Sequence, residues 1–300
     1  ISAIYKSLKH HGLLKLPLVL PDASGENSGK DFLDTLLEPA PGVLPLEGRQ
    51  RELEELYRFI RHKKQKLGII LLTGGGGMGK TRLAAELCSS LAVSRCRWKW
   101  WEKWDAGFLN PSEDLSSPFF NPEHLGKWWN WRQTLVVVDE AASKRELLEK
   151  FLSHLGTNNR SWRKKLFLLL IDRDDGRESG VKSIAGRTSL PACHLPVDVL
   201  SDEEALQLFE AVFIKMNVAC GESLIRPYRQ SIRNANKKSD WRKRPDYVIM
   251  EAVYRCQEGS GAALLEHRDD LPRYFTRRDE EKLKLLAEKK NWEVPFLKRL

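Results

Sequence analysis

The chain has 300 residues, of which 41% are hydrophobic and 30% are charged, and its formal net charge is +9. This length suits two domains with well-buried cores, and the composition is that of a soluble globular protein. The longest apolar runs have six residues, the run at 166–171 among them, whereas a membrane-spanning helix needs about 20. The sequence therefore predicts no membrane span and no membrane partner.

The cysteines indicate neither a disulfide framework nor a zinc site. There are five, and no two of them form a C-x-x-C pair: Cys88, Cys96, Cys193, Cys220 and Cys256. Reduced, buried thiols in a cytoplasmic protein account for them, and no secretory signal is visible. Because the sequence starts at Ile1 and ends in a stretch that looks like an interrupted helix, we expect it to be part of a longer protein.

The first 45 residues are rich in Gly, Pro and Ser and are typical of a linker, with one short helix-like stretch at 32–37. The next segment, LEGRQRELEELYRFIRHKK, predicts an amphipathic helix that begins just after Gly48 and Arg49. Its apolar residues recur at helical spacing: Leu53, Leu56, Tyr57 and Ile60.

From residue 68 onward, predicted strands alternate with predicted helices. Short runs rich in Val, Ile and Leu occur at 68–73, 134–138 and 166–171, and CRWKWW at 96–101 is a weaker strand candidate. Between them lie helical stretches, including 79–92 and 143–155. This alternation predicts a parallel sheet covered by helices on both faces.

After about residue 198 the strand signals stop. The segment SDEEALQLFEAVF opens with a capping box from Ser201 to Glu204, and its apolar stripe is Ala205, Leu208, Phe209, Val212 and Phe213. We therefore predict a linker with a short helix at 1–45, an α/β domain at 46–198 and an all-α domain at 199–300.

Four consecutive glycines stand in LGIILLTGGGGMGKTRLAAEL, although each glycine costs about 0.5–1 kcal/mol relative to Ala in a regular element. The pattern Gly74-x-x-x-x-Gly79-Lys80-Thr81, between an apolar strand and a helix, predicts a P-loop. Such a loop points backbone N–H groups at a phosphate, which requires unusual dihedrals and no Cβ, and the helix N-terminus adds partial positive charge. A purely structural glycine turn is the alternative.

Within the P-loop interpretation, two side chains have defined roles. Lys80 reaches the β- and γ-phosphates, and the Thr81 hydroxyl coordinates Mg²⁺. We expect the Lys80 side chain to lie in a solvent-facing cleft.

The segment TLVVVDE supplies the second half of this constellation. Its apolar strand ends in Asp139 and Glu140. An Asp at the carboxyl end of a neighbouring parallel strand is placed to hold Mg²⁺ through water, and the Glu after it is placed to orient or deprotonate an attacking water. The alternative is a solvated strand end. A Glu beside the Asp favours hydrolysis over binding alone.

A third element is Arg173, which follows the strand in KKLFLLLIDR. A cation at that strand end can reach the γ-phosphate and report its presence. The alternative is a surface arginine paired with Asp174 or Asp175.

In chain order these motifs resemble those of STAND-class NTPases, the NLR-like and AP-ATPase-like signalling ATPases of the wider AAA+ group. GGGGMGKT at 74–81 resembles the Walker A motif, LVVVDE at 135–140 the Walker B motif, and LFLLLIDR at 166–173 the sensor strand. GRQREL at 48–53 resembles the entry motif beside the adenine, and the segments at 195–213 and 244–254 resemble the entry to the lid and its glycine-x-proline segment.

The resemblance spans about residues 46–260 and implies a fold, ligands and a site. The fold is an α/β P-loop NTPase sheet in the order 5-1-4-3-2, followed by an all-α lid, and the cofactors are ATP or ADP with Mg²⁺. The implied nucleotide contacts are Gly48, Arg49, Gly74, Gly75, Gly76, Gly77, Met78, Gly79, Lys80, Thr81, Arg82 and Pro245. The implied catalytic residues are Lys80, Asp139, Glu140 and Arg173, and the implied metal ligands are Thr81 and Asp139.

Proline at position 245 has a further consequence. It fixes its own φ and biases the preceding residue away from helix, so we predict a helix that begins at Pro245 with its N-terminus facing the nucleotide cleft. Two positions depart from the family pattern. Lys243 or Arg244 replaces the glycine of the lid motif, and Glu47 stands where an apolar residue is usual.

The resemblance also implies a role. WDAGFL at 104–109, with its Trp-rich surroundings, resembles bacterial members of the class, many of which look like phage-defence proteins. The implied activity is slow, regulatory ATP hydrolysis in a molecular switch. ADP would hold a closed resting form, ATP would favour an open form that assembles into a homo-oligomer, and effector and sensor domains would lie outside these residues.

Two other functions stay open. A nucleic-acid-binding motor or loader would use the basic stretch at 226–244, which holds eight basic residues and one acidic residue, together with some of the ten tryptophans. A solvated face and tryptophans in packing are the interpretation that we favour. The third function is a scaffold that keeps ADP as a structural ligand, and Glu140 argues against it.

Overall fold

The computed structural model describes residues 18–19, 32–37, 39–62, 65–92, 104–109, 133–157, 165–173, 190–234, 241–259, 270–271 and 273–274. Its contacts divide the chain into two compact units, Ile1–Leu200 and Ser201–Leu300. A search of the described residues for a helix long and apolar enough to cross a membrane found none.

The first unit is built on a six-stranded sheet. Its strands are β1 (Leu18–Val19), β2 (Leu67–Gly74), β3 (Trp104–Leu109), β4 (Gln133–Val138), β5 (Leu166–Arg173) and β6 (Ala192–Pro196). They lie in the order β1-β3-β4-β5-β2-β6. All neighbours are parallel except β1, which pairs antiparallel with β3.

Counted from β2, the five parallel strands follow the predicted order 5-1-4-3-2, which is confirmed. The second of them is 104–109, and the strand candidate at 96–101 lies outside the described residues. The edge strand β1 comes from the stretch predicted to be a linker. Two residues are too few to give a strand pattern in the sequence.

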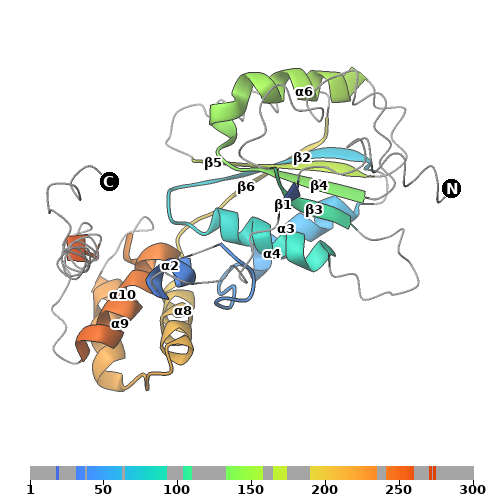
Figure 1. Cartoon of the computed structure of the whole chain (residues 1–300). Helices are drawn as coiled ribbons and strands as arrows, with labels where there is room; N and C mark the ends of the chain where they lie inside the picture. Colours follow the sequence, from blue (N-terminus) through green and yellow to red (C-terminus); the bar gives the residue numbers. More distant parts are fainter. Residues whose placement is uncertain are drawn as a thin grey trace, which may run out of the picture. The chain divides into compact units, whose positions relative to one another are not determined.

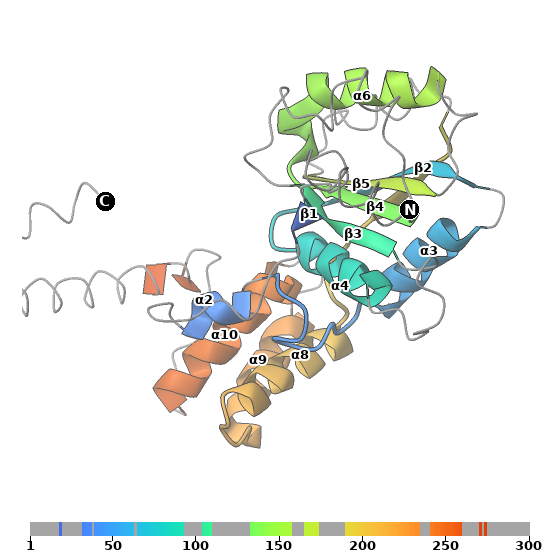
Figure 2. The same cartoon turned by 45° about the vertical axis from the view of Figure 1, so that its right-hand side comes forward.

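Helices cover both faces of the sheet in Figures 1 and 2, with α6 on one side and α3 and α4 on the other. The helices of this unit are α2 (Phe32–Leu37), α3 (Gln50–Arg61), α4 (Lys80–Ala92) and α6 (Arg145–Thr157), the last preceded by the 3₁₀ turn η2 (Ala141–Lys144). Thus the helices predicted at 32–37, 79–92 and 143–155 are present, and so is the amphipathic helix predicted to begin just after Gly48 and Arg49.

The central strand β2 shows why the sheet needs two helical layers. Successive side chains of a strand point to opposite faces. Ile69 and Leu71 pack in one apolar cluster with α6, whereas Ile70 and Leu72 pack in another with α3 and α4. Because the side chains on both faces are apolar, the sequence of β2 is a continuous hydrophobic run, as expected for a buried parallel strand.

The second unit is helical in its described part. It contains α8 (Asp202–Lys215), α9 (Glu222–Asn234), the 3₁₀ turn η4 (Trp241–Lys243) and α10 (Pro245–Glu258). The predicted capping box is present, since Ser201 accepts from the Glu204 backbone N–H and the Glu204 carboxylate accepts from the Ser201 N–H. The predicted stripe of α8 is buried, and Phe209 stacks on Tyr228 of α9 with ring centroids 4.5 Å apart.

Candidate functional site

The glycine run forms the connection between β2 and α4. Gly74, Gly77 and Gly79 have φ values of 154°, 73° and 78°, which side-chain-bearing residues rarely adopt. At Gly74 an added Cβ would lie 2.5 Å from the backbone oxygen of Val197, whereas at Gly76 it would meet nothing within 4 Å. The loop therefore requires glycine at some positions and only tolerates it at Gly76.

This difference gives a matched pair of variants. We expect Gly74→Ala to destabilise the first unit by about 1–3 kcal/mol, because backbone strain and a clash with Val197 act together. Gly76→Ala, in open space, should change stability by less than about 0.5 kcal/mol. Thermal unfolding of the two variants measures both effects, and equal losses would contradict this account of the loop.

Lys80 is the first residue of α4, and its side chain is only 8% exposed. Its Nζ donates to the carbonyl oxygens of Gly74 at 2.8 Å and Gly75 at 2.7 Å. The expectation that this side chain lies in a solvent-facing cleft is therefore wrong. The loop folds around the ammonium group, whose burial is compensated by the two carbonyls.

The predicted metal ligands Thr81 and Asp139 lie together. Thr81 Oγ1, in the first turn of α4, donates to Asp139 Oδ2, just after β4, over 2.9 Å. Hydroxyl and carboxylate oxygens fit Mg²⁺, which usually takes one or two protein ligands and completes its shell with phosphate and water oxygens. No cluster of three or more His, Cys, Asp or Glu that could hold a metal occurs among the described residues.

Glu140 follows in a left-handed conformation, with φ 51° and ψ 47°. Its backbone N–H donates to Asp139 Oδ1 over 2.9 Å, and its carbonyl accepts from the Ser143 N–H and hydroxyl. The side chain is exposed. A non-glycine residue in this conformation costs of order 1–3 kcal/mol, and such strain tends to gather at functional sites.

Arg173 ends β5, and its backbone lies opposite Gly74 in the parallel register. Its side chain is exposed, and its N–H donates to Asp172 Oδ1 over 2.8 Å. The alternative partners Asp174 and Asp175 lie outside the described residues. Since β4 and β2 both flank β5, the ends that carry Asp139, Arg173 and the P-loop share one edge of the sheet.

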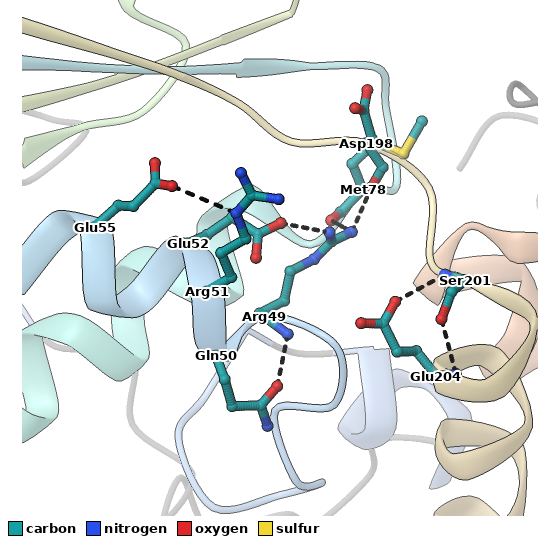
Figure 3. A network of polar contacts seen from close by, with 9 residues as sticks. All are labelled: Arg49, Gln50, Arg51, Glu52, Glu55, Met78, Asp198, Ser201 and Glu204. Atoms are coloured by element: carbon teal, nitrogen blue, oxygen red, sulfur yellow. Dashed lines mark hydrogen bonds and ion pairs between the residues drawn. The ribbon is translucent and has the colours of Figure 1, made fainter.

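Arg49 lies just before α3 and is 4% exposed. Figure 3 shows its guanidinium between three partners: Nη2 donates to the carbonyls of Met78 and Asp198, and Nη1 to Glu52 Oε1. The preceding Gly48 has a φ of 68°. The guanidinium thus contacts protein carbonyls, and the predicted nucleotide contact of Gly48 and Arg49 stays a prediction.

Arg82, near the start of α4, also donates to a backbone carbonyl that is distant in sequence. Its Nη2 donates to the carbonyl of Leu44, in the segment that leads to Gly48. Burial lowers the pKa of this guanidinium, and nearby Glu86 opposes that shift. Nothing in the sequence indicated the Leu44 contact, because its acceptor is a backbone atom.

The predicted helix start at Pro245 is confirmed, since α10 begins there. Arg244 before it is extended, with φ −75° and ψ 134°, as expected for a residue that precedes proline. Lys243, which with Arg244 is one of the two candidates for the position of the lid-motif glycine, forms an ion pair with Asp202 over 2.6 Å. Contact between Pro245 and a nucleotide stays a prediction.

Two residues of the basic stretch at 226–244 are paired with acids within the second unit, whereas Lys237, Lys238 and Asp240 lie outside the described residues. Arg229 pairs with Glu222 over 2.7 Å, Lys243 pairs with Asp202, and the guanidinium of Arg242 lies over the Trp241 ring. These partners fit the interpretation of the stretch as a solvated face.

No protein-family model matches the sequence, and no curated protein is significantly similar to it. Solved structures are similar in fold. The ORC2 protein of Aeropyrum pernix, in ADPNP–ADP complexes, is 15% identical, with a TM-score of 0.52 over 80% of this chain and 70% of that one. A Walker-type ATPase of Pyrococcus abyssi is also 15% identical, with a TM-score of 0.45 over 84% and 75%.

A third similar structure is the RuvB Holliday junction branch migration motor of Thermotoga maritima, at 15% identity and a TM-score of 0.45 over 85% of this chain and 80% of that one. The likeness to the Aeropyrum pernix protein agrees with the strand order and the glycine-rich loop described above. The first unit therefore has the fold of a P-loop NTPase.

Proposed function

We propose that the chain binds ATP or ADP with Mg²⁺ at the P-loop and hydrolyses ATP slowly, as a regulatory switch. The observation that carries this proposal is the hydrogen bond between Thr81 and Asp139. These residues are 58 positions apart in sequence, yet they present a hydroxyl and a carboxylate side by side at the N-terminus of α4. A purely structural glycine turn has no need of that pairing.

Each residue of the site then has a physical role. The backbone N–H groups of the loop and the N-terminus of α4 bind the phosphates, and Lys80 supplies the positive charge nearest to them. Thr81 and Asp139 would hold Mg²⁺, which neutralises phosphate charge when bound. Glu140 orients or deprotonates water, and Arg173 responds to the γ-phosphate from the end of β5.

The finer assignment rests on the resemblance to STAND-class NTPases. In it, ADP favours a resting form and ATP favours a form that assembles into homo-oligomers, with effector and sensor domains outside this chain. A ligand can shift such an equilibrium only by its differential affinity for the two forms. An antiviral-defence role in the cytoplasm is the biological setting that the resemblance suggests.

The direct test is a turnover assay combined with calorimetry on the purified chain. We expect binding of ATP and ADP in the presence of Mg²⁺, and slow release of phosphate from ATP. Absence of binding would overturn the proposal. Tight ADP binding with no turnover, even in the complete and triggered protein, would instead support the scaffold function.

The nucleic-acid function has its own test. Phosphate contacts make affinity fall steeply with salt, so a gel-shift series across salt concentrations detects them. A steep salt dependence with tight binding at low salt would favour a motor or loader over a switch.

Pro245 tests the proposed role of the helical unit as a lid. We expect Pro245→Ala to speed ADP release by more than it weakens ATP binding, because the lid would act chiefly on the resting form. Stopped-flow release of a fluorescent ADP measures this. Pro227→Ala, at a proline inside α9 of the same unit, is the control and should leave release unchanged. Equal release rates for both variants and the wild type would contradict the lid assignment.

A further inference from the structure

Arg49 joins three segments that are distant in sequence. Its Nη2 donates to the carbonyl oxygen of Met78 in the P-loop at 3.1 Å and to that of Asp198 at 2.6 Å, while Nη1 donates to Glu52 Oε1 at 3.0 Å (Figure 3). Asp198 lies two residues beyond the end of β6 and three before Ser201, where the helical unit begins. One guanidinium thus links the P-loop to the segment that leads into the second unit.

The two carbonyl contacts depend on each other. The Nη2 group has two N–H donors, and the carbonyls of Met78 and Asp198 account for both. Arg49 Nε is already buried without a hydrogen-bond partner. Loss of either carbonyl would leave another donor of this buried group unsatisfied, which is costly. The position of Met78 O therefore constrains that of Asp198 O.

The Met78 carbonyl is also tied to the phosphate-binding face of the loop. It shares one peptide plane with the N–H of Gly79, and in a trans peptide these two groups point in opposite directions. An anion that accepts a hydrogen bond from the Gly79 N–H therefore orients the carbonyl that Arg49 holds. The guanidinium thus contacts one side of a peptide whose other side carries the Gly79 N–H, a donor that the proposed function assigns to the phosphates.

A second contact attaches the segment between β6 and the second unit, the exit segment 197–200, to the start of the P-loop. The Val197 N–H donates to Thr73 O over 2.7 Å, and a Cβ at Gly74 would lie 2.5 Å from Val197 O. Val197 and Leu200 are buried. The exit segment 197–200 is thus bound both where the P-loop begins and, through Arg49, where it ends.

We propose that Arg49 is a positioning residue that transmits occupancy of the P-loop to the exit segment 197–200. This rests on the proposed nucleotide binding and adds the route by which a bound phosphate reaches the connection to the helical unit. By linkage, the order of that segment in turn affects nucleotide affinity by the same factor.

Hydrogen exchange on the full chain, with and without ADP and Mg²⁺, tests the proposal. In the wild type we expect ADP to slow exchange at least about fivefold both in the P-loop and at 197–200, within the range of ordinary allosteric coupling. With ADP at a concentration that saturates each variant, so that a changed affinity has no effect, the P-loop of Arg49→Gln and Arg49→Met should be protected while 197–200 loses its response. The Met variant fills the site with an apolar side chain. It removes the ion pair of Glu52, but the Glu52 side chain is 16% exposed and can be hydrated, so the variant should fold.

The neighbouring Arg51 provides the control, because its side chain is 90% exposed and makes only a 3.5 Å ion pair with Glu55. Arg51→Met and Arg51→Gln should respond to ADP as the wild type does. An ADP response at 197–200 that survives in the Arg49 variants would overturn the proposal. Unfolding of both Arg49 variants would do so too, since it would assign Arg49 a purely structural role.

Hydrogen exchange in the wild type distinguishes a failure of this proposal from a failure of the proposed function. Protection of the P-loop without protection of 197–200 would overturn the role of Arg49 and leave nucleotide binding intact. No ADP response anywhere would overturn both.

Discussion

Lys80→Ala should weaken ATP binding at least about tenfold, or 1.4 kcal/mol. The ammonium group is held within the loop by the carbonyls of Gly74 and Gly75, and under the proposed nucleotide binding it is the charge that contacts the β- and γ-phosphates. Removing it takes away the side-chain cation that the loop itself positions. Titration calorimetry with ATP and Mg²⁺ measures the loss, and an unchanged affinity would contradict the P-loop assignment.

The burial of Lys80 requires a control for stability, because the variant also removes two hydrogen bonds from the loop. Lys165 is suitable, since its Nζ likewise donates to two carbonyls at the C-terminal end of α3, those of Ile60 at 2.7 Å and His62 at 2.9 Å. Both alanine variants should lose of order 1–3 kcal/mol of stability. Only Lys80→Ala should lose ATP affinity.

The sequence predicted the buried strands better than the edge strands. β2, β4 and β5 are covered on both faces, so most of their residues are apolar and form runs that are recognisable in the sequence. β3 lies beside the two-residue edge strand β1, and β6 forms the other edge. Their side chains alternate between more and less exposed positions, and in strands of five or six residues that alternation is a weak signal.

Some contacts of the candidate site could also be predicted from the sequence, and others could not. The proximity of Thr81 and Asp139 could be predicted, because the carboxyl ends of parallel strands meet at one edge of a sheet. The partners of Arg49 and Arg82 could not, because they bind backbone carbonyls, which every residue has. Glu52, three residues after Arg49, is the only one of these partners that a helical charge pattern could have indicated. Neither the burial of Lys80 nor the left-handed turn at Glu140 follows from residue types.

Glu140→Gln should leave ATP affinity nearly unchanged and slow hydrolysis by about 10²-fold or more, the usual cost of losing a general base. The amide matches the carboxylate in shape, so the left-handed turn and its hydrogen bonds to Asp139 and Ser143 should persist. What is lost is the negative charge and the ability to accept a proton from water.

This separation of binding from chemistry distinguishes Glu140 from a residue that merely shapes the turn. Single-turnover hydrolysis and calorimetry on one preparation measure both, and the ATP-bound form should accumulate in the variant. Glu146→Gln, at an exposed residue in the first turn of α6, should hydrolyse ATP as the wild type does. If Glu140→Gln retains the wild-type rate, Glu140 is a structural acid at a strained turn, and water must be activated by another group.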